Sequence, residues 1–294
     1  MQVQLFLQQI INGLSLGSIY ALIALGYTMV YGIIKLINFA HGEVFMMGAF
    51  VSFFVLAYLK VNFYISMLIA MIFCALLGVI IEKIAYRPLR KSTRVAALIT
   101  AIGVSYLIQN LMVYFIGPEV RSFPSPIVGA PIQVFGIYIQ LKQIFVFVIS
   151  IALMLILQFL INHTKMGKAM RAVAVDAQAA ELMGINVNRV ISFCFAIGSG
   201  IAGITGVLFG IYYGAIEPTM GTMPGLKAFV AAVVGGIGSI PGAMIGGVLI
   251  GVLETLVTAL GYSMYKDAAV YALLIMILLV LPQGILGKNK KEKV

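Results

Sequence analysis

The chain has 294 residues, of which 62% are hydrophobic and only 10% are charged. A soluble domain has about a quarter of its residues charged, so this composition excludes an ordinary soluble protein. The formal net charge of +10 would suit a nucleic-acid-binding protein, but thirteen of the 19 Lys and Arg residues fall in the stretches 83–94, 165–189 and 288–293. Basic residues that cluster beside apolar segments mark the cytoplasmic side of a membrane protein instead.

The apolar sequence falls into nine runs, and one helix needs about 20 residues to cross a bilayer. The first run is too long for one upright span, and Gly26, Gly32, Lys35 and Asn38 near its end predict one helix followed by a broken one. The run 225–238 is too short to cross as a regular helix. We therefore expect an all-α polytopic membrane protein with about 8–10 transmembrane helices, some short or broken. The runs lie at about 5–34, 42–59, 62–86, 95–116, 141–161, 190–214, 225–238, 241–261 and 268–287.

Counting these runs across the membrane places all three basic stretches on one side, which the positive charge assigns to the cytoplasm. The loop at about 162–189 and the basic C-terminal tail 287–294 are then cytoplasmic, and the proline-containing stretch 117–140 is external. The same count places the N-terminus outside with nine crossings, or inside with ten if the first run breaks in two.

Two parts of the chain have the same order of features. Residues 13–59 and 198–261 each run from a Gly-rich helix through an interrupted segment with a buried charge to another Gly-containing helix. Interrupted segments in corresponding halves of a transporter point to its translocation site. Small residues at four-residue spacing in 198–214, and again in 242–251, predict close helix packing within the chain or against a partner.

Polar side chains within apolar sequence are candidates for the translocation pathway, because such groups are costly in a membrane and either line a cavity or pair with each other. Asn38, His41 and Glu43 lie together in the segment INFAHGE. They form either a gate in the pathway or a structural knot of hydrogen bonds at a helix break. Further pathway candidates are Gln109, Asn110, Glu217 and Lys227.

Lys227 also has an alternative role. If the segments 225–238 and 241–261 pack antiparallel, Lys227 can form an ion pair with Glu254. The sequence leaves both roles open.

The loop 163–190 is too polar to span the membrane. Its centre, from Met166 to Met183, is rich in helix-forming residues and has no proline, so it predicts a helix that Gly184 ends. A short helix at the inner surface is what a soluble motor would contact, although an interfacial helix without a partner has the same pattern.

Three segments carry a resemblance to a known family. QAAELMG, from Gln178 to Gly184, looks like the Glu-Ala-Ala-x-x-x-Gly signature of ABC-importer permeases, with Gln in place of the first Glu. The N-terminal stretch GLSLGSIYALIALGYTMVYGIIKLINFAHGEVFMMGAF and the later GGIGSIPGAMIGG resemble the H-type permease subunits of high-affinity branched-chain amino-acid importers. The resemblance extends over nearly the whole chain, and it implies a single transmembrane permease domain, 1–294, in a bacterial plasma membrane.

The resemblance also implies partners: a paralogous permease or a second copy of the chain, two ATPase subunits and an extracytoplasmic binding protein that delivers Leu, Ile or Val. Residues in the loop would then form a coupling helix that seats on an ATPase. The chain has no phosphate-binding Gly-x-x-x-x-Gly-Lys-Ser/Thr motif, so we expect no enzyme activity and no cofactor of its own; ATP and Mg²⁺ would be used by the partners. The expected coupling residues are Arg171, Asp176, Ala179, Ala180 and Gly184.

Two other functions remain open. Related permeases for urea or short-chain amides share these signatures, and a stand-alone secondary transporter would also have many spans and buried charges. The long basic loop favours the ATP-driven importer over the secondary transporter, because an ion-coupled carrier does not need such a loop.

Overall fold

The structure is a computed structural model that describes residues 2–127, 129–134 and 136–287. Most of the predicted basic tail, residues 288–294, lies outside these described residues. Within them, eight helices are long and apolar enough to cross a membrane, as predicted. These helices are α1 (Gln2–Ile34), α2 (His41–Leu59), α3 (Phe63–Ile81), α4 (Arg94–Ile116), α5 (Leu141–His163), α8 (Val187–Tyr213), α10 (Ile240–Ala259) and α11 (Lys266–Val280), the last of which reaches the needed length together with the turn before it, as the span Ser263–Val280.

The remaining elements are short. A π-helical segment, Glu82–Tyr86, extends α3, and a 3₁₀ turn, Pro88–Lys91, leads to α4; another 3₁₀ turn, Ser263–Tyr265, precedes α11. The short helices are α6 (Lys165–Val175), α7 (Ala177–Leu182) and α9 (Thr222–Gly235), and the strands are β1 (Arg121–Ser122), β2 (Ile132–Val134), β3 (Ile137–Ile139) and β4 (Ala215–Ile216). The strand β1 pairs antiparallel with β4, and β2 pairs antiparallel with β3.

The first apolar run does not break at its glycines, so the expectation of a broken helix there was wrong. The helix α1 is continuous through Gly26 and Gly32 and ends at Ile34. Gly26 is needed for packing: a Cβ at this position would overlap the His41 ring. The break lies between α1 and α2, where Lys35 has a left-handed φ of 56°.

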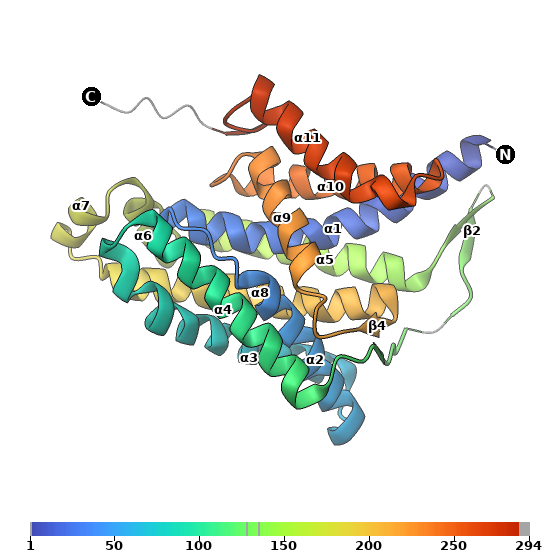
Figure 1. Cartoon of the computed structure of the whole chain (residues 1–294), viewed down its shortest axis with the longest axis horizontal. Coiled ribbons are helices and arrows are strands. Elements are labelled where there is room, and N and C mark those ends of the chain that lie inside the picture. The colour runs from blue at the N-terminus through green and yellow to red at the C-terminus, as the bar shows by residue number, and fades with distance from the viewer. Residues whose placement is uncertain (1, 128, 135, 288–294) are drawn as a thin grey trace.

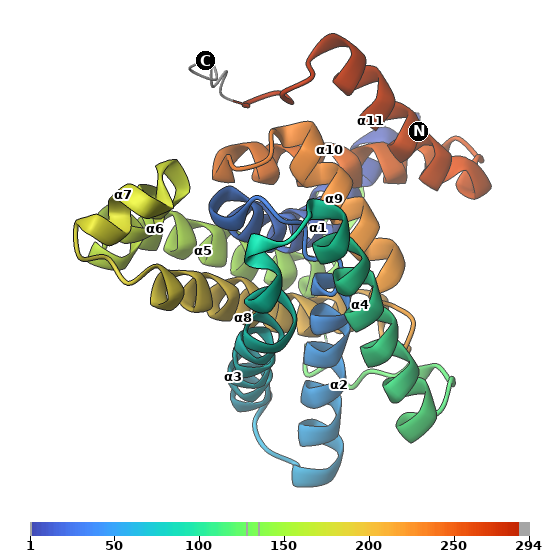
Figure 2. The ribbon, with the colours of Figure 1, turned by 60° about the vertical axis from the view of Figure 1, so that its left-hand side comes forward.

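The helices α1 and α8 form the centre of the bundle, and most of their residues are buried. α1 packs along α10 and α9, whereas α8 packs along α3 and α2. The helix α1 therefore contacts the two helices that come after α8 in the chain, and α8 contacts the two that come after α1 (Figures 1 and 2). The duplication over residues 13–59 and 198–261 stays a prediction.

The small residues at four-residue spacing serve packing within the chain. A Cβ on Gly247 would overlap Ala21 of α1, and one on Gly206 would overlap the Phe45 carbonyl of α2. Glycine at these positions lets the helix backbones approach closely, and dispersion contacts replace the hydrophobic driving force that a lipid environment lacks.

The bundle has two ends. At one end, the Gln8 side chain exchanges hydrogen bonds of 2.8 Å with the backbone of Tyr138, which puts the start of α1 beside the 117–140 connection. The other end carries α6 and α7 (Figure 1). There the Tyr86 hydroxyl donates to Asn38, just beyond the end of α1. A single α1 thus joins the 117–140 end to the basic-loop end, so the first apolar run crosses once and does not break in two.

Candidate functional site

The N-termini of α2 and α9 meet inside the bundle. A Cβ on Gly42 would overlap the Gly221 carbonyl oxygen, so a larger residue at this position would force the two helix starts apart. Neither helix start has a side-chain cap among the described residues. Transporters of this architecture commonly place substrate at such helix breaks, where half-helix N-termini provide free backbone N–H groups and a positive dipole end.

Glu43 lies at this junction and is 1% exposed. Its Oε1 accepts hydrogen bonds from the hydroxyls of Ser105 (3.3 Å) and Thr222 (3.4 Å). Ser105 is at the middle of α4, and Thr222 is the first residue of α9, so the carboxylate ties three helices together. Its Oε2 has no hydrogen-bond partner among the described residues.

A cleft of about 220 Å³ opens at this junction between α2, α4 and α9. Gln109 lines it and donates a 3.2 Å hydrogen bond to Thr222 Oγ1. A second cavity, of about 490 Å³, contains Glu217 and shares Thr222 with the first. The cleft is lined by Tyr27, Phe39, Glu43, Ile102, Ser105, Tyr106, Gln109, Gly221, Thr222, Gly225 and Leu226.

Asn38 and His41 have a different place from Glu43. Asn38 accepts a 3.0 Å hydrogen bond from the Tyr86 hydroxyl and stabilises the connection between α1 and α2. His41 packs edge-on against Tyr27 with a centroid distance of 4.9 Å. Neither of its ring nitrogens makes a hydrogen bond of normal geometry with the described residues. Of the three predicted polar residues, Glu43 lines the cleft, whereas Asn38 and His41 are not among its lining residues.

Asn110 does not line the cleft. It is exposed, and its amide donates to the Tyr106 carbonyl one turn earlier in α4. Ser105 and Thr222, by contrast, were not among the predicted pathway residues. A hydroxyl in the middle of the run 95–116 was a signal for Ser105, but the sequence did not indicate its contact with Glu43.

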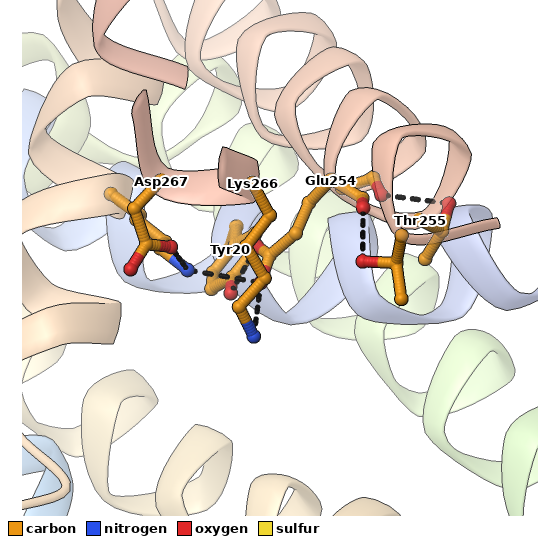
Figure 3. Close-up of polar contacts among 8 residues, drawn as sticks. Tyr20, Glu254, Thr255, Lys266 and Asp267 are labelled. Atoms are coloured by element: carbon orange, nitrogen blue, oxygen red, sulfur yellow. Dashed lines mark hydrogen bonds and ion pairs between the residues drawn. The ribbon is translucent and has the colours of Figure 1, made fainter. Parts of the chain in front are cut away.

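Lys227 belongs to a buried charge network on the opposite side of α9. Its ammonium lies 2.9 Å from Glu254 Oε1 and 2.6 Å from Asp267 Oδ1. Tyr20 donates to Glu254 at 2.8 Å, and Lys266 lies 3.3 Å from the same carboxylate. Figure 3 shows Tyr20, Glu254, Lys266 and Asp267 gathered where α1, α10 and α11 meet. The predicted Lys227–Glu254 ion pair is confirmed, and the structure places Lys227 away from the cleft.

The loop 163–190 forms two helices, so the expectation of one helix from Met166 to Met183 was wrong. Asp176 separates α6 from α7, because its extended backbone ends α6 while its carboxylate accepts from the N–H groups of Gln178 and Ala179. Gly184 has a φ of +83°, which suits the predicted helix stop. The segment has the form of a helix pair with a side-chain cap at its bend.

The predicted coupling residues differ in how far they are exposed. Ala179 and Gly184 are exposed, whereas Ala180 is buried. The Arg171 guanidinium donates to the Ile161 carbonyl at the end of α5, so it fastens α6 to the bundle. The surface at the end of the helix pair is apolar instead, with Val175, Leu182 and Met183 each at least 80% exposed.

A family model described as "Branched-chain amino acid transport system / permease component" matches residues 9–281. The chain is 48% identical to the high-affinity branched-chain amino acid transport system permease protein LivH of Salmonella typhimurium, over 98% of both chains. It is 43% identical to the corresponding permease protein BraD of Pseudomonas aeruginosa, also over 98% of both.

A solved structure, PsaBC from Streptococcus pneumoniae in complex with Fab, has a similar fold. Its TM-score is 0.52 and its sequence identity 11%, and the match covers 95% of this chain and 92% of that one. At this identity the likeness concerns the fold alone. The chain, a multi-pass membrane protein, belongs to the family of permease components of branched-chain amino acid transport systems.

Proposed function

We propose that this chain translocates Leu, Ile and Val across the bacterial plasma membrane as the non-catalytic permease of an ABC importer. The observation that carries the proposal is the match of 48% identity over 98% of the chain to a high-affinity branched-chain amino acid permease. The partners are two ATPases, a second permease and an extracytoplasmic binding protein. No feature of the described cleft favours the alternative substrates, urea or a short-chain amide.

The translocation pathway passes through the cleft at Glu43, Gln109 and Thr222 and the neighbouring cavity at Glu217. Three features support this path. It lies where the two predicted repeats meet, it contains Ser105 and Gln109 of α4, and it is bordered by the N-termini of α2 and α9. Substrate sites at repeat interfaces near the bilayer midplane are common in transporters.

ATPase movements enter through α6 and α7. The exposed apolar side chains of Val175, Leu182 and Met183 offer a surface that an ATPase groove can cover, and the Asp176 cap and Gly184 stop hold α7 in place. In this arrangement Ala179 and Gly184 contact the motor, while Arg171 and Ala180 keep the helix pair attached to the membrane helices. The basic-loop end of the bundle, with the C-terminus, is then cytoplasmic.

Reconstitution of the complex in vesicles tests the proposal. The chain is assembled with its partner permease, two ATPases and binding protein, and uptake of radiolabelled Leu, Ile, Val and urea is measured with ATP inside the vesicles. We expect ATP-dependent uptake of the three amino acids. Uptake that persists without ATP but follows an ion gradient would refute the proposal, as would transport of urea alone.

A further inference from the structure

The Glu43 carboxylate lacks a counter-ion among the residues that the structure describes. It is 1% exposed, and no Lys or Arg of the described residues lies within ion-pair distance of it. The other carboxylates buried in the bundle are paired: Glu82 with Arg90, and Glu254 with Lys227 and Lys266. Buried charges in membrane proteins normally pair in this way or mark a substrate pathway.

The two oxygens of Glu43 have different surroundings. Oε1 accepts from the hydroxyls of Ser105 and Thr222. Oε2 is buried without a partner and faces Gly221, where an added Cβ would lie 2.6 Å from it. Two hydroxyl donors thus hold the carboxylate in position, and one oxygen is left free for a donor that the described part of the chain does not provide.

We propose that Glu43 binds the α-ammonium group of the amino acid during its passage, a role that rests on the transport function proposed above. The ammonium provides the missing positive charge and donates to Oε2. The carboxylate end of the same substrate then faces the uncapped start of α9, whose Gly221 and Thr222 line the cleft. The apolar side chain lies along Phe39, Ile102 and Leu226.

Because Gly221 covers Oε2, the oxygen becomes accessible when the start of α9 separates from α2. Gly42 and Gly225 approach closely across this boundary and have no side chains to interlock, and we expect the two helix starts to part during transport. The ammonium site therefore opens and closes with the junction of the two repeats.

Two substitutions at Glu43 distinguish this role from a purely structural one. Glu43→Gln keeps the size and the acceptor for Ser105 and Thr222 but removes the charge. Glu43→Asp keeps the charge but shortens the side chain. A structural knot tolerates Gln better than Asp, whereas an ammonium site tolerates Asp better than Gln. Glu119→Gln, at an exposed carboxylate after α4, is the matched control.

The measurement is leucine uptake per assembled complex in reconstituted vesicles, together with ATP hydrolysis stimulated by the leucine-loaded binding protein. A charge-assisted hydrogen bond contributes enough that Glu43→Gln should lower uptake about tenfold or more. We expect Glu43→Asp to retain more uptake than Glu43→Gln, and stimulated ATP hydrolysis by Glu43→Gln to stay within about twofold of the wild type. Glu119→Gln should match the wild type.

Two results overturn the assignment: uptake by Glu43→Gln within twofold of the wild type, or greater loss in Glu43→Asp than in Glu43→Gln. The wild-type complex reports separately on the proposed function. If it hydrolyses ATP but transports no branched-chain amino acid, the transport function itself fails. If it transports leucine and the two variants rank in the opposite order, only the ammonium site fails.

Discussion

Lys227 is the buried cation of the network that joins α9, α10 and α11, and its replacement by Met tests how far that network stabilises the bundle. Its side chain is 5% exposed and contacts the carboxylates of Glu254 and Asp267. Lys227→Met keeps the length of the side chain but leaves Glu254, which is 4% exposed, with only the Tyr20 hydroxyl and Lys266 as partners.

Removal of one partner from a buried ion pair costs about 3–5 kcal/mol, because the other charge stays buried. Lys266 is 40% exposed and lies 3.3 Å from Glu254, so it compensates in part. We therefore expect a loss of about 3 kcal/mol in the free energy of unfolding. At about 2–4 °C per kcal/mol, this corresponds to a decrease in Tm of about 6–12 °C.

The assay is thermal unfolding of the purified permease in detergent or nanodiscs, with Lys266→Met as the matched control. Lys266→Met removes the partly exposed cation and should cost at most about 1 kcal/mol. The double variant Lys227→Met with Glu254→Leu removes both charges and should recover most of the lost stability. If Lys227→Met and Lys266→Met lower Tm equally, or if the double variant is less stable than Lys227→Met, the argument from buried charge is refuted.

Three further substitutions test other parts of the structure. Gly184→Trp adds a side chain at a φ of +83° on the exposed end of the helix pair; we expect an assembled complex without substrate-stimulated ATP hydrolysis, and unchanged stimulation in vesicles would contradict the coupling role. Asp176→Ala removes the cap of α7 at a cost of about 1 kcal/mol, so amide hydrogen exchange in 177–182 should accelerate about fivefold while Tm stays unchanged; protected amides would show that the cap is dispensable. Gly221→Ala places a Cβ against Glu43 Oε2 and the Gly42 carbonyl; we expect uptake to decrease about tenfold or more, whereas Gly103→Ala, which has open space around it, should transport normally.

Several structural features followed from local sequence. The apolar runs predicted the spanning helices, because a bilayer requires about 20 apolar residues for each. The short run at 225–238 predicted a segment too short to cross the membrane as a regular helix, and α9 has 14 residues. The ion pair between Lys227 and Glu254 also followed, since two charges in neighbouring apolar helices have few other partners.

The predictions that were wrong concern residues whose structural role depends on a contact that their type alone does not reveal. Gly26 and Gly32 looked like helix breakers, yet α1 runs through both, and Gly26 makes room for His41. Helix propensity predicted one helix across the basic loop, but the Asp176 side chain caps a second helix there and ends the first. Propensity describes each residue alone, so it does not detect a capping contact or a packing clash.

For the candidate site, too, the sequence predicted some features and the tertiary structure decided the others. The sequence by itself determined that the chain crosses a membrane many times and carries a polar group near Glu43, because hydropathy and charge placement are local properties; the resemblance of its motifs to importer permeases added the transport function. Only the tertiary structure decided that Glu43 meets Ser105 and Thr222, while Asn38, Asn110 and Lys227 bond elsewhere. These partners lie 62 and 179 residues from Glu43 along the chain. They come together only because α1 packs against α9 and α10 while α8 packs against α2 and α3, an arrangement that no single segment encodes.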